Sequence, residues 1–255
     1  NNKVIVDIPV EKLQLSINKL PIIKVDGNIN KKGSICTTYK QISNEAVLRF
    51  EIGKIIGKGG YGTVYEATLL GGYAAPKIYI NQKIIIKVQD LYNNNENKLN
   101  LLKEILIHLI LNSDIEIYKH IPVYIGSFRL GNKIGFIMQY SGKNTLSSLL
   151  GVDYFNNNNI TSILLQTSKI IEIMQKKYSF IHGDFKPNNL MVYSTKKKSK
   201  KFLGVDIKLY GYTVKIIDFG FSTIKTKRYI IKSNPYTKHI TNKFYIDLLF
   251  LSINL

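Results

Sequence analysis

The stretch that decides the fold lies at residues 182–189 and reads His-Gly-Asp-Phe-Lys-Pro-Asn-Asn. Phosphoryl transfer to a hydroxyl needs a carboxylate that orients the nucleophile and accepts its proton, a cation near the γ-phosphate, and ligands for a metal. Asp184, Lys186 and Asn189 supply these three kinds of group within six residues. The stretch therefore indicates phosphoryl-transfer chemistry, and its meaning for the fold depends on two further motifs.

The second motif follows 29 residues after Asn189 and reads Asp218-Phe219-Gly220. It is preceded by Val-Lys-Ile-Ile at residues 214–217, a run that predicts a short strand. Asp218 would therefore stand at the end of a strand, and a carboxylate there can serve as a second ligand for Mg²⁺.

The third motif lies upstream, where residues 57–64 read Gly-Lys-Gly-Gly-Tyr-Gly-Thr-Val and fit the pattern G-x-G-x-x-G-x-V. Glycines allow a tight turn whose backbone N–H groups can approach phosphate oxygens without a side chain in the way. The motif joins two predicted strands, residues 50–56 and 63–69, whereas a dinucleotide-binding fold needs a helix after the glycines. Alone, the motif also fits a glycine-rich hairpin that binds nothing, but the ordered set of three motifs is highly specific.

In this order the three motifs resemble those of protein kinases, over about residues 50–255. The resemblance implies an α+β, two-lobed fold with a β-rich N-lobe and a helical C-lobe. The implied domains are an N-terminal extension at 1–48, an N-lobe at 49–140 and a C-lobe at 141–255. Strands in the first half and a helical period over residues 160–178 agree with this division.

The resemblance also implies ATP and Mg²⁺ as cofactors and assigns the site residues. By this likeness Asp184 is the catalytic base, Lys186 assists at the γ-phosphate, and Asn189 and Asp218 hold Mg²⁺. The residues expected to contact ATP come from the glycine motif, a strand, a helix and the strand that enters the inter-lobe hinge: Ile56, Gly57, Lys58, Gly59, Gly60, Tyr61, Gly62, Val64, Lys87, Glu104, Met138, Gln139 and Tyr140. Met138 would be the gatekeeper, which is compatible with packing in the core.

Two lysines compete for the position that anchors ATP. Lys87 ends a β-branched run suited to a buried strand, whereas Pro76 would remove a ladder hydrogen bond beside Lys77. We therefore predict Lys87, paired with Glu104 on a helix expected from about Glu96 to Leu111. Glu96 is the weaker partner, because an acidic residue near a helix start is expected from the helix dipole alone.

Lys186 is typical of serine/threonine kinases, so the expected reaction is transfer of the γ-phosphate to Ser/Thr hydroxyls of protein substrates. Gly183 replaces the arginine of His-Arg-Asp, which removes the acceptor for a phosphorylated activation loop. His-Gly-Asp also resembles small-molecule phosphotransferases and the small kinase of the tRNA-modification machinery. The alternatives are therefore a small-molecule or RNA-linked kinase, or a catalytically weak pseudokinase or scaffold that binds ATP.

The sequence after Gly220 departs from the kinase pattern. It has no Ala-Pro-Glu, and only 29 residues separate Asp218 from Asp247, which resembles the aspartate of the central C-lobe helix. We therefore expect a shortened C-lobe. Such segments resemble divergent kinases of large DNA viruses, and the Lys/Asn/Ile bias fits an AT-rich genome, which would place the protein in the host cytoplasm or the virion.

Charge is the most conspicuous property of the composition, with 36 Lys+Arg against 17 Asp+Glu and a net charge of +19. Five lysines lie in residues 196–201, where we favour a solvated loop over a docking site for nucleic acid or an acidic partner. The excess is of Lys rather than Arg and reads as compositional bias.

The rest of the composition excludes several classes of protein. A hydrophobic content of 45% excludes wholesale disorder, and no apolar run reaches the roughly 20 residues that span a bilayer. The lone Cys36 excludes an internal disulfide.

Overall fold

The computed structural model describes residues 6–7, 24–39, 46–59, 62–90, 95–130, 133–202, 204–226 and 229–232. The chain divides into two compact units. Residues 8–105 and 123–140 form what we call the sheet unit, and residues 1–7, 106–122 and 141–255 form the helical unit. The boundary falls within helix α2 (Asn95–Ser113).

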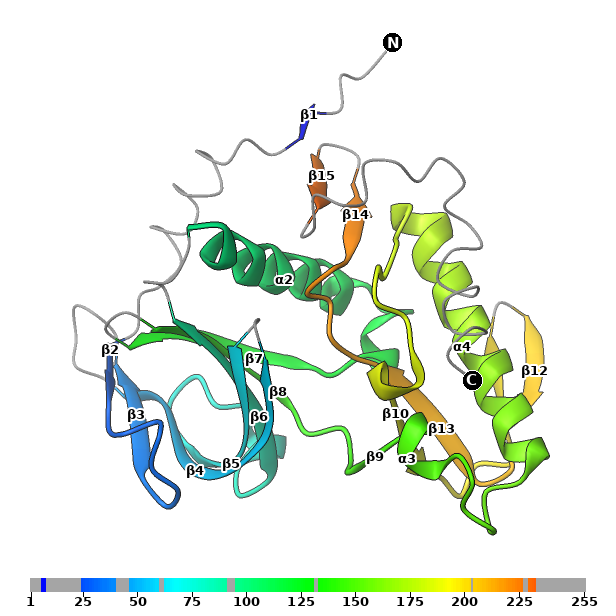
Figure 1. The fold of residues 1–255 in the computed structure, drawn as a ribbon, viewed down its shortest axis with the longest axis horizontal. Helices are drawn as coiled ribbons and strands as arrows, with labels where there is room; N and C mark the ends of the chain where they lie inside the picture. The colour runs from blue at the N-terminus through cyan, green and yellow to red at the C-terminus, as the bar shows by residue number, and fades with distance from the viewer. Residues whose placement is uncertain are drawn as a thin grey trace. The chain divides into compact units, whose positions relative to one another are not determined.

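The sheet unit contains a curled, seven-stranded sheet with the order β2-β3-β4-β5-β6-β8-β7, in which neighbouring strands are antiparallel (Figure 1). Its strands are β2 (Lys24–Asp26), β3 (Ile35–Tyr39), β4 (Ala46–Gly59), β5 (Gly62–Gly71), β6 (Lys83–Asp90), β7 (Tyr124–Leu130) and β8 (Lys133–Gln139). A 3-10 helix, η1 (Lys77–Tyr79), lies between β5 and β6. The strands expected at residues 50–56 and 63–69, and the β-branched run that ends at Lys87, therefore belong to one sheet.

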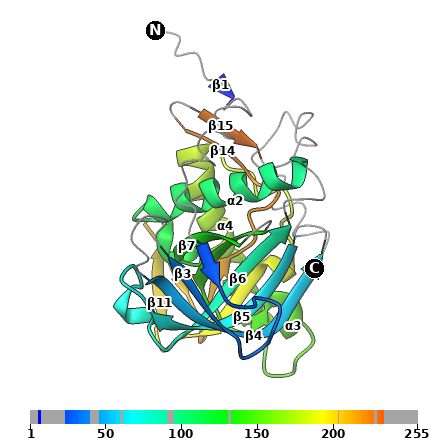
Figure 2. The same ribbon diagram turned by 90° about the vertical axis from the view of Figure 1, so that its left-hand side faces the viewer.

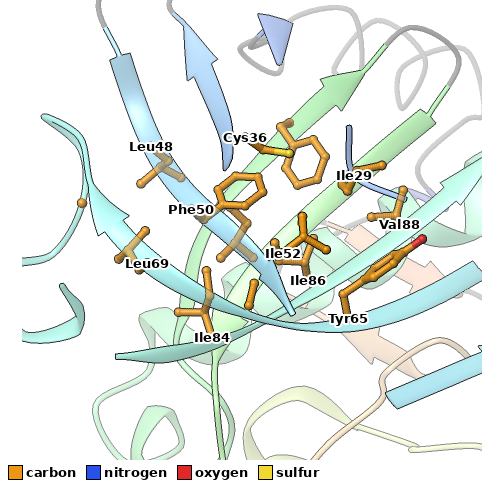
Figure 3. Close-up of a cluster of buried hydrophobic side chains, with 14 of the residues drawn as sticks. Ile29, Cys36, Leu48, Phe50, Ile52, Tyr65, Leu69, Ile84, Ile86 and Val88 are labelled. Carbon is orange, nitrogen blue, oxygen red and sulfur yellow. The ribbon is translucent and has the colours of Figure 1, made fainter. Parts of the chain in front are cut away.

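The side chains of these strands explain how the sheet forms. In β5, buried Tyr65, Ala67 and Leu69 alternate with partly exposed neighbours, which is the period of a strand with one covered face. The core that they join includes Phe50 (Figure 3). The Phe50 ring lies 5.8 Å from that of Phe128. Strand β6 differs, because Lys87 is buried as well as the apolar residues on either side of it.

The helical unit contains α4 (Asn157–Tyr178) and the short α3 (Leu146–Leu149), with three small sheets. The first has the order β13-β10-β9, and the second is the β11–β12 hairpin. In the third, β1 pairs in parallel with β15, and β15 pairs with β14 (Figure 2). Its strands are β1 (Val6–Asp7), β9 (Asn144–Thr145), β10 (Leu190–Ser194), β11 (Ser199–Phe202), β12 (Val205–Lys208), β13 (Tyr212–Ile216), β14 (Thr223–Lys225) and β15 (Tyr229–Lys232), and two 3-10 helices, η2 (Tyr118–His120) and η3 (Pro187–Asn189), complete the unit.

Helix α4 starts three residues before the position expected from its apolar period. Asn156 precedes it, and the Asn156 side chain accepts hydrogen bonds from the backbone N–H groups of Asn158 and Asn159. The Asn159 side chain in turn accepts the backbone N–H of Asn156. This capping box satisfies N–H groups that lack partners within the helix, so the cap, rather than the first apolar residue, fixes the start.

The lysine run also differs from expectation, because it does not form a loop throughout. Ser199–Phe202 pairs with Val205–Lys208 as an antiparallel hairpin, so Lys200 and Lys201 lie in a strand. Phe202 and Ile207 are buried and anchor the hairpin. The apolar anchors stand singly between charged residues, which is why the sequence gives little indication of a strand. Over the described ranges, no helix has both the length and the apolar character to cross a bilayer.

Phe50 provides a test of the sheet-unit core. We expect Phe50→Ala to lower the free energy of unfolding by about 3 to 5 kcal/mol, because it removes a fully buried ring and leaves a cavity. Ile55→Ala is the matched control on the same strand. Its side chain is 55% exposed, so the loss should stay below about 1 kcal/mol. Denaturant unfolding followed by circular dichroism measures both, and equal losses would contradict this description of the core.

Candidate active site

The ladder between β10 and β13 brings two of the sequence motifs together in the helical unit. The strands are antiparallel, with Leu190 opposite Ile216, and the Ile217 N–H donates to the Asn189 carbonyl at 3.0 Å. In an antiparallel pair, the residue before one strand and the residue after the other lie at the same end of the ladder. Asn189 and Asp218 therefore meet at one end, although 29 residues separate them.

Asp184 makes two side-chain interactions at this end of the ladder. The Lys186 ammonium lies 2.8 Å from the Asp184 carboxylate. The Asn189 amide nitrogen donates to the backbone carbonyl of Asp184 at 2.8 Å and to its carboxylate at 3.2 Å. The Asp184 side chain is 31% exposed, so a carboxylate held in one orientation remains open to an incoming group.

Asp218 supplies the second carboxylate of this cluster and is exposed. It has a left-handed backbone with φ of 62°, and its carboxylate accepts the Gly220 N–H at 3.4 Å. Because both bonds to Asp184 use the nitrogen of the Asn189 amide, the oxygen of that amide remains available as a ligand. Mg²⁺ prefers oxygen ligands and is commonly held by one or two protein groups together with water and substrate phosphates. The residues present therefore fit a magnesium ion.

His182 and Phe219 are buried and contact each other next to the two motifs. His182 is fully buried, its Nε2 lies 2.9 Å from the Ile217 carbonyl, and its ring is 5.8 Å from that of Phe219. Sequence reasoning missed two further contributors. His108 packs edge-on against Phe219 at 5.4 Å, and the Ser222 hydroxyl donates to the His182 carbonyl at 3.0 Å.

The missed residues differ in whether the sequence contained a signal for them. His108 continues the buried face of α2 three residues after Ile105, so helical periodicity could have found it. Ser222 carries no such signal. Of the other histidines, His120 is also buried, and His239 lies outside the described residues.

Gly183 occupies its position for a steric reason. Its φ is +79°, and a Cβ there would lie 2.5 Å from the Phe221 carbonyl oxygen. A left-handed backbone costs an ordinary residue about 1 to 2 kcal/mol even before such a clash. The local backbone conformation therefore requires glycine at this position and excludes arginine.

In the sheet unit, Lys87 and Glu104 form a buried ion pair. The Lys87 ammonium lies 2.8 and 2.9 Å from the two Glu104 carboxylate oxygens, and the side chains are only 8% and 4% exposed. Lys77 lies in η1 and is exposed, and the side chain of Glu96 lies outside the described residues. Burial of two charges is costly unless they are paired and hydrogen-bonded, so the carboxylate of Glu104 holds the Lys87 ammonium in one position.

The glycine motif forms the end of the β4–β5 hairpin, where Gly57 pairs with Val64, and Gly59 pairs with Gly62. Gly62 has φ of +113°, and a Cβ there would lie 2.3 Å from the Val88 carbonyl oxygen, so its packing against β6 already requires glycine. Gly59 has nothing within 4 Å of the same position. Ile56 and Lys58 are exposed, whereas Gly60 and Tyr61 lie outside the described residues.

Met138, Gln139 and Tyr140 lie at the end of β8. Met138 pairs with Ile85, and Gln139 donates its backbone N–H to the Val123 carbonyl at 2.8 Å. The N–H of Gln139 is therefore already used within the sheet unit, and Tyr140 is the first of the three beyond the strand.

Comparisons with known proteins agree with these motifs. The family model described as protein kinase domain matches residues 50–245. The serine/threonine-protein kinase shk2 of Schizosaccharomyces pombe is 25% identical over 199 residues, which is 76% of this chain and 29% of that protein. A probable serine/threonine-protein kinase of Dictyostelium discoideum is 27% identical over 213 residues, 82% of this chain and 40% of that protein.

Among solved structures, the crystal structure of the BubR1 kinase domain matches with a TM-score of 0.57 and 22% identity, and covers 86% of this chain and 59% of that one. The chain thus spans less than half the length of the two curated relatives named above. The BubR1 match confirms the expected α+β, kinase-like fold, with its curled β-sheet and few helices. Because the family model covers most of the sequence, the chain belongs to the protein kinase domain family.

Proposed function

We propose that the chain is an ATP- and Mg²⁺-dependent protein kinase that phosphorylates Ser/Thr hydroxyls of protein substrates. The observation that carries the proposal is the cluster of Asp184, Lys186 and Asn189 beside Asp218 at one end of the β10–β13 ladder. We take residues 49–140 as the N-lobe, 141–255 as the C-lobe and 1–48 as an extension.

Asp184 acts as the general base in this proposal. Asn189 and Lys186 hold its carboxylate, so it would orient the acceptor hydroxyl and receive the proton as the new O–P bond forms. Positioned proton transfer of this kind contributes about 10²- to 10⁴-fold to the rate. Lys186 in turn would place a positive charge near the transferred phosphoryl group.

Asn189, through its amide oxygen, and Asp218, through its carboxylate, would hold Mg²⁺. The ion, when bound, neutralises charge on the phosphates of ATP. Lys87 would contact the α- and β-phosphates, and Glu104 fixes the position of its ammonium. Backbone N–H groups of the glycine motif, at Gly57 and Gly59, would approach the phosphate oxygens.

Protein substrates with Ser or Thr are favoured by Lys186 and by the likeness to the two serine/threonine-protein kinases named above. The cytoplasm is the compartment that we propose. Cys36 is the lone cysteine and is free and buried, which suits a reducing environment.

A small-molecule or RNA-linked acceptor is the second candidate, and Gly183 is the observation that favours it. The backbone there leaves no room for the arginine that protein kinases commonly carry. The acceptor that takes label from γ-labelled ATP separates the two candidates.

Replacement of either carboxylate tests the proposed chemistry. Asp184→Asn should lower turnover by about 10²- to 10⁴-fold, because the amide cannot accept the hydroxyl proton. Asp218→Ala should abolish Mg²⁺-dependent transfer. Phosphate transfer from labelled ATP to a panel of Ser/Thr peptides measures both. Asp153→Asn, at an exposed turn, is the control and should keep full activity, whereas retained activity in either site variant would refute the assignment.

The two candidate lysines can be separated directly. Lys87→Met should lower turnover by at least about 10²-fold through loss of a phosphate contact, whereas Lys77→Met should leave it unchanged. Lys87→Met also leaves the Glu104 carboxylate buried without its ammonium, and this costs about 3 to 5 kcal/mol of stability.

The double variant Lys87→Met/Glu104→Leu distinguishes misfolding from lost catalysis. An apolar pair of similar volume commonly restores the stability that a broken buried ion pair loses, so this variant should unfold near the wild-type midpoint and remain inactive. Recovered turnover in the double variant would mean that Lys87 serves only the fold.

Regulation by loop phosphorylation should be absent. Gly183 offers no cation to a phosphate, and Thr223 is buried in β14. Phosphatase treatment, and separately Thr226→Ala, should leave turnover unchanged in the peptide assay. Loss of activity on dephosphorylation, with Thr223 or Thr226 identified as the modified residue, would contradict this.

A further inference from the structure

A second feature of the helical unit lies beside the β11–β12 hairpin and is separate from the cluster around Asp184. A pocket of about 510 Å³ is lined by the turn that precedes the hairpin, by β12 and by the turn that follows it. Among the residues of its wall are Lys196, Lys197, Lys198, Asp206, Lys208 and Tyr210. We call this feature the basic pocket.

The basic pocket has an excess of positive charge that its own surroundings do not balance. Four lysines line it against one carboxylate, that of Asp206. Within the described part of the chain, the ion pairs involve other lysines. Positive charges gathered around a concave wall raise the local concentration of anions.

Lys200 of the same hairpin lies outside the wall of the pocket, among a second group of cations. Lys200 lies 3.5 Å from the Nδ1 atom of buried His120. Burial, and next the charges of Lys119, Lys197 and Lys215, lower the pKa of Lys200 to about 8. These charges add to the positive potential around the hairpin.

Tyr210 gives the pocket an aromatic wall. It stands in the turn after β12 with a left-handed backbone of φ 47°, and 41% of it is exposed. The Lys208 ammonium lies 4.6 Å from the centre of its ring. An exposed ring flanked by cations is the arrangement on which single-stranded nucleic acids stack their bases while lysines contact the backbone.

We propose that the basic pocket binds single-stranded nucleic acid through its phosphate backbone, with Tyr210 as a stacking surface. The exposed ring of Tyr210 separates this ligand from a phosphorylated peptide. A base can stack on the aromatic face while the lysines contact the backbone phosphates, whereas a phosphate group on a peptide would need the lysines alone. The proposal does not depend on the kinase activity proposed above.

The test is fluorescence anisotropy with labelled, unstructured single-stranded DNA and RNA over a series of salt concentrations. The triple variant Lys196→Ala/Lys197→Ala/Lys198→Ala should weaken binding by at least about tenfold at low salt and reduce the salt slope by about 2, because three phosphate contacts are lost. Lys31→Ala/Lys32→Ala/Lys54→Ala removes the same charge from exposed positions of the sheet unit and should change neither quantity appreciably.

Tyr210→Asn tests the stacking surface, because asparagine tolerates the left-handed backbone. It should weaken binding by about fivefold or more while leaving the salt slope unchanged, since a stacking contact involves no counterion release. An unchanged affinity would remove Tyr210 from the proposal.

Three outcomes would overturn the proposal. Equal weakening in the two triple variants would mean attraction to net charge rather than a site. Preferential binding of poly-glutamate, or of a phosphopeptide, would assign the pocket to an acidic protein partner. No binding of either nucleic acid at low salt would reject it outright. Asp184→Asn should bind the oligonucleotides as the wild type does, so failure of the kinase proposal and failure of this one are distinguishable.

Discussion

The hydrogen bond from the Ile217 N–H to the Asn189 carbonyl is the interaction on which the candidate site depends. It extends the β10–β13 ladder by one step and fixes which residues meet beyond it. A shift of one residue in this register would turn the side chains of β13 to the opposite face and separate Asp218 from Asn189. Buried Leu190 and Ile216, opposite each other at the end of the ladder, oppose such a shift because it would expose them.

The sheet unit satisfies a different constraint, which is a charge held away from water. Lys87 is buried within β6, and the facing carboxylate of Glu104 makes that position tolerable. Apolar residues of similar size would serve stability at least as well. The buried ion pair is therefore better explained by a functional role of the ammonium than by a contribution to stability. Gly62 illustrates the opposite case, because packing against Val88 requires glycine whether or not a nucleotide binds.

The sequence predicted the α+β class and the principal strands because their apolar residues alternate or run continuously, as in Tyr65, Ala67 and Leu69. The contacts among Asp184, Lys186 and Asn189 could be anticipated because the three residues are close in the chain. The hairpin within the lysine run was missed, since its buried anchors Phe202 and Ile207 form no recognisable period. The reason for Gly183 was also hidden, because a clash with the Phe221 carbonyl depends on a chain path that local sequence does not encode.

Compositional bias and a functional basic surface can be distinguished by where the lysines gather and what stands beside them. A bias toward lysine distributes cations over the whole surface, and many then acquire carboxylate neighbours. Lys169 and Lys176 both contact Glu172, and Lys177 contacts Asp114. The lysines of the basic pocket have a single carboxylate among them in its wall, and they stand around a recess that contains an aromatic ring. A net charge of +19 therefore says little by itself, whereas four lysines around one recess with a single carboxylate point to a particular surface.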